Sequence, residues 1–281
     1  MATRTYSVRE TNPDNFEALH EGVPVWLKNT LDQWLELNLS NPMSGSNRSA
    51  KDSLIRKIER KLRIDLSGGS TGMMMWKNTK ARMNSNPELT LDIVSALLEM
   101  KGDECHPDIL ETMLEESGSK WCVRDVDGIL CLDERVEGTL SEAFEDAVGY
   151  GGLVSKYLST SWQNTFGRNP DPSVSYSNSI KAVEAALHPF VIPNDKEATL
   201  GKMIGHIEGN LGSYGVSIPE RKGGLGIEGT IKQLKLVWQG QTDRHGTSNP
   251  VTPTQEAAEQ ALFICLSISQ QAIRGRLFEI T

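Results

Sequence analysis

Residues 171–189, with the sequence DPSVSYSNSIKAVEAALHP, contain the pattern that decides the fold. Asp171 followed by Pro172 is typical of the start of a helix. Apolar side chains then recur at helical spacing, at Tyr176, Ile180, Val183 and Leu187. The pair His188-Pro189 is expected to end the helix, because proline cannot continue the hydrogen-bond ladder. The stretch therefore predicts an amphipathic helix with one buried face.

The chain on both sides of this stretch shows the same spacing. Before it, a helix is expected from 139 to about 166, with glycines near 149–152 where it can kink. After it, Thr199 and Thr252 are typical N-cap residues, the second with Pro253 at the first helical position. A further helix is expected near 227–239. Four long helices with a short extra one predict a helical bundle.

The first hundred residues also favour helices, whereas residues 120–136 change character. There, two β-rich runs flank Asp127-Gly128, a typical two-residue hairpin turn. With this turn, Val123 is expected to oppose Leu132, and Asp125 to oppose Leu130.

The expected fold is therefore mainly α, with one small β-hairpin near 120–136. We take the hairpin as the marker of a domain boundary. On this interpretation residues 1–118 form a helical N-terminal region, and residues 119–281 form the hairpin plus a helical bundle.

The composition excludes several classes of protein. The chain has 281 residues, a net charge of −8 and a pI of about 5.3, so it is not a globally basic nucleic-acid binder. Residues 91–147 hold 16 acidic and 4 basic side chains, so an anionic partner is expected to bind elsewhere. No apolar run approaches the roughly 18 residues of a membrane span, and the polar start MATRTYSVRE is no secretory signal. We therefore expect a cytoplasmic protein.

Cysteines and histidines show no metal-site pattern. The 4 cysteines include no C-x-x-C pair, and the 5 histidines never pair at ligand spacing. Buried, reduced thiols and no metal or other cofactor are expected.

Three phosphate-binding or catalytic motifs also fail. The P-loop pattern is absent from the sequence. Residues 68–72 match G-x-S-x-G and residues 224–229 match G-x-G-x-x-G, but neither lies in the parallel-sheet context that these motifs need.

Basic side chains concentrate in residues 48–63, which hold 7 basic and 2 acidic residues. Here Leu54, Ile55, Ile58 and Leu62 are expected to form a buried helix face. Arg56, Arg60 and Arg63 are expected to point away from it. A solvated surface is one interpretation of these arginines, and contact with nucleic-acid phosphates is the other.

Polar side chains crowd into residues 238–246, WQGQTDRHG, between two apolar helices. Histidine can take and give protons near neutral pH, and arginine can stabilise charge that develops on a phosphate. His245 and Arg244 are therefore candidates for RNA cleavage without metal. His245 would move protons at the 2′-hydroxyl or the leaving oxygen, and Arg244 would stabilise the phosphorane. The alternative is a structural histidine that caps a helix. The neighbouring candidates for substrate binding are Gln239, Gln241 and Asp243.

The segment from about 139 to 275 resembles the C-terminal helical domain of bacterial abortive-infection (Abi) proteins, within the HEPN superfamily. It covers about half of the chain. The resemblance is carried, in this order, by residues 176–186 (YSNSIKAVEAA), 198–201 (ATLG) and 243–246 (DRHG), followed by a long Ala-rich helix.

This resemblance implies a metal-independent endoribonuclease that acts on RNA as a homodimer, in antiviral defence against phage or as a toxin. A phage-encoded trigger or an antitoxin would be a further partner. Lys181 and Glu184, at i and i+3 on one helix, would line the site, and a surface ion pair is the alternative. The family has an arginine followed by the histidine after a gap of four to six residues. This chain departs from that pattern, with Trp238, Gln239 and Gly240 at the expected arginine positions.

Two other functions stay open. The departure from the family pattern and the overall acidity favour a non-catalytic HEPN-like binding or sensor protein, which engages a partner or nucleic acid without cleaving it. A binder of small nucleotides, through the Gly-rich residues 209–229, is the third hypothesis.

Overall fold

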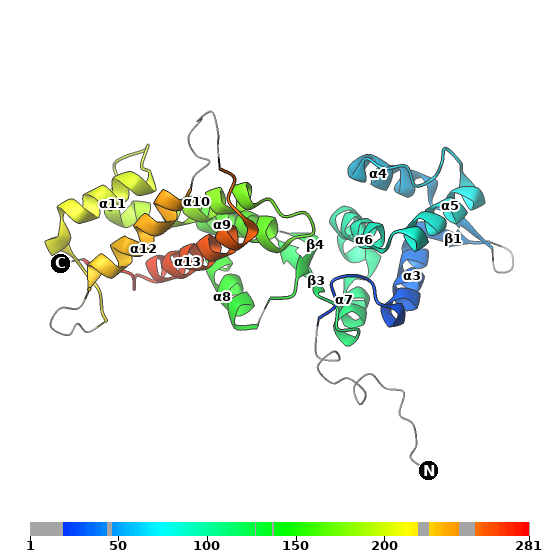
Figure 1. The fold of residues 1–281 in the computed structure, drawn as a ribbon, viewed down its shortest axis with the longest axis horizontal. Coiled ribbons are helices and arrows are strands. Elements are labelled where there is room, and N and C mark those ends of the chain that lie inside the picture. Colours follow the sequence, from blue (N-terminus) through cyan, green and yellow to red (C-terminus); the bar gives the residue numbers. More distant parts are fainter. Residues whose placement is uncertain are drawn as a thin grey trace, which may run out of the picture. The chain divides into compact units, whose positions relative to one another are not determined.

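The computed structural model describes residues 19–43, 47–126, 128–136, 138–218, 225–241 and 251–280. The chain divides into two compact units, Met1–Arg135 and Val136–Thr281. Helices dominate both units, and the strands among the described residues form short antiparallel pairs (Figure 1). The prediction of a mainly α fold with a small hairpin is confirmed.

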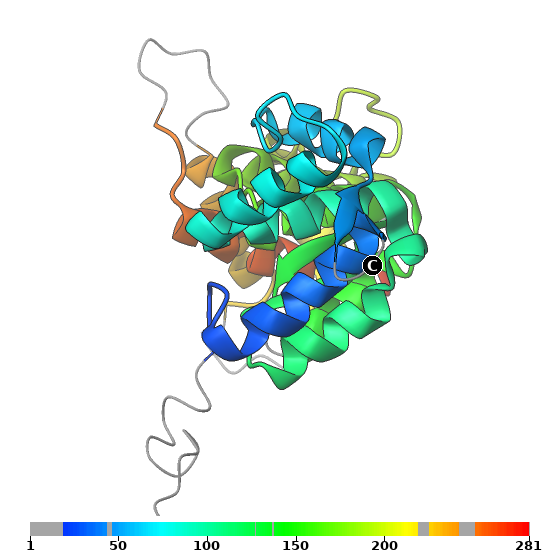
Figure 2. The same cartoon turned by 90° about the vertical axis from the view of Figure 1, so that its right-hand side faces the viewer.

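The first unit contains five α-helices among its described residues, together with a short 3₁₀ turn (η1) and two strand pairs. In chain order the elements are α3 (Val25–Leu39), β1 (Ser40–Pro42), β2 (Arg48–Ala50), α4 (Asp52–Leu62), α5 (Gly72–Ser85), α6 (Pro87–Lys101), η1 (Gly102–Cys105), α7 (Pro107–Glu116), β3 (Trp121–Val126) and β4 (Ile129–Glu134). Figure 2 turns this unit toward the viewer, with α3 in blue.

Helix α6 lies at the centre of the first core. It packs against α4, α5 and β4, and eight of its residues are buried. Helix α3 adds the apolar stripe expected from its spacing, since Leu27, Leu31, Trp34 and Leu35 are all buried. Burial of one such side chain stabilises a fold by about 1.5–3 kcal/mol. Helical spacing places these side chains on one face, so their burial stabilises the packed helices of this unit.

The hairpin has the predicted register. Val123 pairs with Leu132 and Asp125 with Leu130, and Gly128 at the turn has a φ of 81°, which favours glycine. Its place in the chain differs from the prediction, however. Strand β4 packs on α6 and β3 packs on α7, so the hairpin belongs to the first unit.

A carboxylate on α7 holds the hairpin in place. Glu111 accepts a hydrogen bond from the backbone N–H of Val123 at 2.6 Å, and its other oxygen binds Arg135 at 2.8 Å. The boundary between the units falls after Arg135, whereas the sequence analysis placed it at 118/119. These contacts join residues at least 12 positions apart, and no local sequence signal reports them.

The second unit is a helical bundle. In chain order its described elements are α8 (Gly138–Val148), α9 (Gly152–Phe166), α10 (Pro172–Val191), α11 (Leu200–Gly209), the 3₁₀ turn η2 (Leu211–Ser213), β5 (Tyr214–Gly215), α12 (Ile227–Gly240), α13 (Gln255–Ile273) and β6 (Glu279–Ile280). Strands β5 and β6 form a short antiparallel pair.

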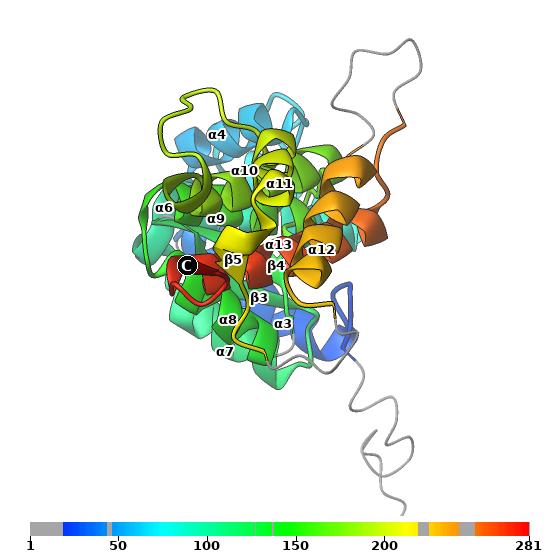
Figure 3. The same cartoon turned by 90° about the vertical axis from the view of Figure 1, so that its left-hand side faces the viewer.

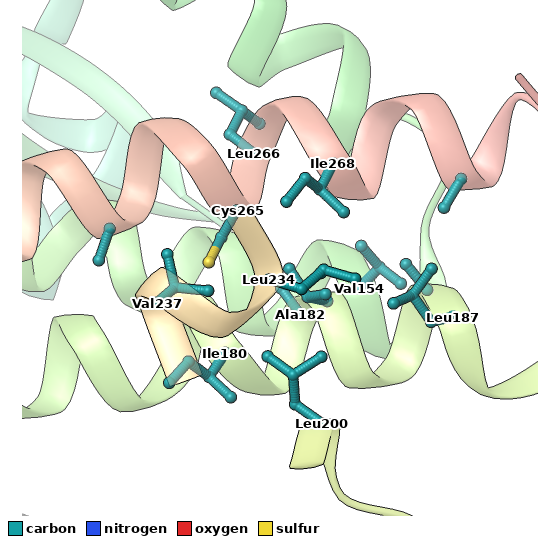
Figure 4. Close-up of a cluster of buried hydrophobic side chains, with 14 of the residues drawn as sticks. Val154, Ile180, Ala182, Leu187, Leu200, Leu234, Val237, Cys265, Leu266 and Ile268 are labelled. Carbon is teal, nitrogen blue, oxygen red and sulfur yellow. The ribbon is translucent and has the colours of Figure 1, made fainter. Parts of the chain in front are cut away.

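Helix α10 lies at the centre of the bundle and packs against α9, α11 and α13. Asp171 caps it as predicted, because its carboxylate accepts hydrogen bonds from the backbone N–H groups of Ser173 and Val174. The predicted stripe is buried at Tyr176, Ile180, Val183 and Leu187. Figure 4 shows Ile180, Ala182 and Leu187 among side chains from α9, α12 and α13.

Two helix boundaries differ from the sequence prediction. The expected helix from 139 to 166 is two helices, since Gly151 and Gly152 take φ values of 73° and 74° that end the helical path. Helix α10 continues past Pro189 to Val191. Proline there removes one hydrogen bond in the last turn, which the packed helix tolerates.

A cluster of hydroxyl groups is buried between α9 and α10. Ser161 Oγ lies 2.6 Å from Ser179 Oγ and 2.9 Å from the carbonyl oxygen of Ser175, to which it donates. Thr165 Oγ1 lies 2.6 Å from Ser175 Oγ. These hydroxyls satisfy one another, so small polar side chains can line a closely packed helix interface without leaving unpaired groups.

All four cysteines are buried, as predicted, and none of them forms a disulfide bond. Among the described residues, no helix combines the length and apolar character that crossing a membrane requires.

Candidate functional site

The C-terminal end of α12 is fixed against α10. The Tyr176 hydroxyl donates a hydrogen bond to the carbonyl oxygen of Val237 at 3.0 Å. A Cβ atom at Gly240 would collide with that same hydroxyl. Residue 240 must therefore be glycine for the last turn of α12 to approach α10 this closely.

Two of the predicted site residues lie at this helix end. Gln239 is exposed in the last turn, and Gln241 is the half-buried C-cap residue. Asp243, Arg244 and His245 lie outside the described residues, so their grouping with the two glutamines stays a prediction.

The start of α13 is also attached to the bundle. Thr254 is the N-cap residue, since its hydroxyl accepts a hydrogen bond from the N–H of Ala257 at 3.2 Å. The predicted start at Thr252-Pro253 was two residues early. The Gln255 side chain donates to the carbonyl oxygen of Thr165 on α9 at 2.7 Å. The described residues on both sides of segment 242–250 are thus anchored to α9 and α10.

Glu184 connects α10 to α11. Its Oε1 accepts a hydrogen bond from the backbone N–H of Leu200, the first residue of α11, at 2.7 Å. Burial raises the pKa of the Glu184 carboxyl, while this hydrogen bond and the charge of Lys181 oppose the rise. Lys181 itself is exposed, and the described structure contains no ion pair between the two side chains. Glu184 is therefore not simply one member of a surface ion pair with Lys181.

A second close approach joins α11 to α12. A Cβ atom at Gly201 would lie 2.8 Å from the indole ring of Trp238. Figure 3 shows the two helices side by side, in agreement with their contacts. Two of the segments that carry the resemblance, 176–186 and 198–201, therefore meet each other through Glu184 and meet the end of α12 through Tyr176 and Gly201.

Lys181 and Glu184 also line a pocket of about 530 Å³. The other polar groups in its wall are Tyr157 of α9, His188 of α10 and Lys196 of the α10–α11 connection. The sequence analysis missed these three residues. Residues 181, 184 and 188 share a helix face at i, i+3 and i+7, which was a detectable signal. Tyr157 and Lys196 come from other elements, and their proximity depends on the packing of the bundle.

The three arginines of the basic α4 segment lie in different environments. Ile55 and Ile58 are buried, and Leu54 and Leu62 are partly buried against the core, so the predicted apolar face is confirmed. Arg56 donates to the carbonyl oxygen of Ser70 at 3.2 Å and lies 3.8 Å from a Glu59 oxygen.

By contrast, Arg60 and Arg63 are exposed. Arg56 is thus engaged within the unit, while Arg60 and Arg63 are open to solvent.

The Gly-rich segment 209–229 is described only in part, because residues 219–224 lie outside the described ranges. Gly226, with a φ of 47°, serves as the N-cap of α12. Its role in the structure is to begin that helix.

Within the described ranges, no group of three or more His, Cys, Asp or Glu side chains is arranged to hold a metal ion. The chain matches no protein-family model, no curated protein and no solved structure.

Proposed function

We propose that the second unit is a HEPN-type endoribonuclease that cleaves RNA without metal, in a phage-defence or toxin-like effector that works as a homodimer. His245 is the general acid and base, and Arg244 contacts the phosphate. Gln239, Gln241 and Asp243 bind the substrate beside them, and Lys181 and Glu184 contact it from α10.

One observation supports this proposal above the others. The chain enters segment 242–250 from a helix end fixed on Tyr176 of α10, and leaves it at Gln255, which is bound to Thr165 of α9. These anchors hold the two described helix ends in defined positions on the bundle, and a site supported by rigid elements is positioned more precisely than one that is not.

The proposed reaction is transfer of a phosphodiester to its own 2′-oxygen. His245 accepts the 2′-hydroxyl proton while that oxygen attacks phosphorus. The bond from phosphorus to the 5′-oxygen breaks, and the protonated His245 donates a proton to the leaving oxygen. Arg244 stabilises the extra negative charge on the phosphorane. The products are a 2′,3′-cyclic phosphate and a free 5′-hydroxyl.

The test compares the purified full chain with His245→Ala on total RNA in EDTA. We expect the wild type to cleave RNA and the variant to cleave it at least about a hundredfold more slowly, as is typical when a general acid or base is removed. His206→Ala is the matched control, because His206 is exposed on α11. Cleavage that persists in His245→Ala would contradict the assignment of this site.

A non-catalytic nucleic-acid or partner binder is the second candidate. The exposure of Arg60 and Arg63 on α4 favours it, as does the absence of an arginine at positions 238–240. Arg56 is the wrong residue for a test, since it is engaged with Ser70 and Glu59.

For this candidate, we expect Arg60→Glu with Arg63→Glu to weaken RNA binding and to reduce its dependence on salt. Lys77→Glu, at another exposed position, is the control. Equal binding by the double variant and the control would remove α4 as the binding surface.

A further inference from the structure

The pocket that Lys181 and Glu184 share lies wholly within the second unit. Its walls come from α9, α10, the α10–α11 connection and α11, and its volume is about 530 Å³. Sites for small molecules and cofactors typically measure about 300–1,000 Å³. The pocket therefore has the size of a site for a ligand as large as a nucleotide.

Two ammonium groups that form no ion pair among the described residues stand at this pocket. Lys181 on α10 and Lys196 on the connection are both exposed, and the described structure contains no ion pair or hydrogen bond for either ammonium. The nearest acid in sequence to Lys196 is already engaged, since Asp195 binds the Lys202 ammonium at 3.0 Å. The two lysines are thus available to an anion from outside the chain.

The carboxyl and imidazole groups in the wall are engaged in hydrogen bonds. Glu184 directs Oε1 to the N–H of Leu200, and burial raises the pKa of its carboxyl. With one carboxyl against two ammonium groups, the wall keeps more basic than acidic side chains. His188 donates from Nε2 to the carbonyl oxygen of Asp195 at 2.9 Å, because a carbonyl can only accept. That bond fixes the ring and leaves Nδ1 for a ligand.

The remaining wall is apolar and includes one aromatic ring. Leu153 and Val154 of α9, Ala185 of α10 and Met203 of α11 line it together with Tyr157. An aromatic ring beside aliphatic side chains suits a planar base, since bases stack on aromatic side chains regardless of their identity.

We propose that this pocket binds a nucleotide phosphate, with Lys181 and Lys196 on the phosphate and Tyr157 against the base. The phosphate can belong to a free nucleotide or to a nucleotide within an RNA strand. The inference does not rest on the proposed RNA cleavage, because binding requires no reaction at His245. A free nucleotide at this place would contact α9, α10 and the α10–α11 connection.

The test measures binding to the full chain by calorimetry, with three probes. They are adenosine monophosphate, inorganic phosphate and a 2′-O-methyl hexanucleotide, which has no free 2′-hydroxyl and cannot be cleaved by the proposed reaction. The variants are Lys181→Met with Lys196→Met and, separately, Tyr157→Ala. Lys232→Met is the control, because Lys232 is exposed on α12 and outside the pocket.

We expect the double lysine variant to weaken binding of adenosine monophosphate by at least about tenfold, and the Lys232→Met control to bind like the wild type. Tyr157→Ala should weaken adenosine monophosphate about tenfold and leave inorganic phosphate unchanged. Binding of the hexanucleotide alone, with the same dependence on the lysines, would support the proposal with the RNA strand as the source.

Absence of binding by all three probes would overturn the proposal, as would equal binding by the double lysine variant and the wild type. Because cleavage is not measured, failure here is distinguishable from failure of the proposed ribonuclease. If the protein cleaves RNA but binds none of the probes through these lysines, the pocket proposal is overturned and the proposed ribonuclease activity is unaffected.

Discussion

The Oε1 atom of Glu184 lies 2.7 Å from the backbone nitrogen of Leu200, and this hydrogen bond joins the middle of α10 to the first residue of α11. The carboxylate is partly buried, and burial raises its pKa above the ordinary value of 4.5. The interaction therefore combines a favourable hydrogen bond with an unfavourable burial of charge.

Glu184→Gln should keep the acceptor oxygen and remove the buried charge. For a carboxyl whose pKa is raised on folding, the folded state binds more protons than the unfolded chain between the two pKa values. The free energy of unfolding of the wild type should therefore fall, relative to the variant, as pH rises from about 4 through the raised folded-state pKa.

The measurement is urea unfolding of both proteins across this pH range. At neutral pH the glutamine variant should be at least as stable as the wild type. A variant that is less stable at neutral pH, by a difference that shrinks as the pH falls to 4, would show that the charge itself stabilises the α10–α11 contact.

Gly240→Ala should destabilise the second unit by about 1–3 kcal/mol, the usual cost of forcing an extra carbon into a packed site. The added Cβ meets the hydroxyl of Tyr176, which is 5% exposed and cannot swing away without losing its hydrogen bond to Val237. Gly209→Ala is a matched control, since Gly209 also ends a helix but has no atom within 4 Å of the added carbon.

The same clash can be tested by removing the hydroxyl. Tyr176→Phe alone should cost about 1 kcal/mol through the lost hydrogen bond. In the double variant the alanine has room. Its loss of unfolding free energy should therefore be smaller than the sum of the losses in the two single variants, as measured by a double-mutant cycle. Strict additivity would mean that the end of α12 is free to move away from α10.

Ser161→Ala should lower the free energy of unfolding by about 1–3 kcal/mol, because it removes the hydroxyl partner of the buried Ser179 and a hydrogen bond to the carbonyl oxygen of Ser175. Ser155→Ala on the same helix should change it little, since the described structure shows no hydrogen bond for that hydroxyl. Chemical unfolding of the two variants provides the comparison. Equal stability would indicate that a buried water replaces the lost group.

The native protein should resist thiol reagents at pH 8. Burial raises the pKa of Cys122 to about 11 and also raises the pKa values of Cys105 and Cys265, so the reactive thiolate is scarce. All four cysteines are buried, so we expect no labelling by a chromogenic disulfide until denaturant is added, and then four equivalents. Rapid labelling of the folded protein would contradict the burial of at least one thiol.

The elements that the sequence predicted well depend on local periodicity. The buried stripes of α3 and α10 and the register of β3 with β4 follow from spacing along the chain, and the structure has all three. The observed boundary differs from the expected one because Glu111 holds the hairpin, a contact that no periodic pattern contains. The break near residue 150 shows that three glycines so close together end a helix where one would only bend it.

The candidate site was predictable in part. Lys181 and Glu184 were found as neighbours on one helix face, and the structure places both in one pocket. Tyr157 and Lys196 were missed because each lies on a different element and has no motif of its own. The resemblance that suggested His245 and Arg244 involves residues outside the described ranges, so this part of the site stays a prediction.

The two buried cores share no residue. One draws its members from residues up to Leu132, and the other begins at Val136, with its buried members from Phe144 onward. A cut in the peptide chain beside Arg135 would therefore sever no core. Each half is a candidate for separate expression and ligation, so that one half alone carries isotope labels. Magnetic resonance spectra of the labelled half would then report on the nucleotide pocket without overlap from the other half of the chain.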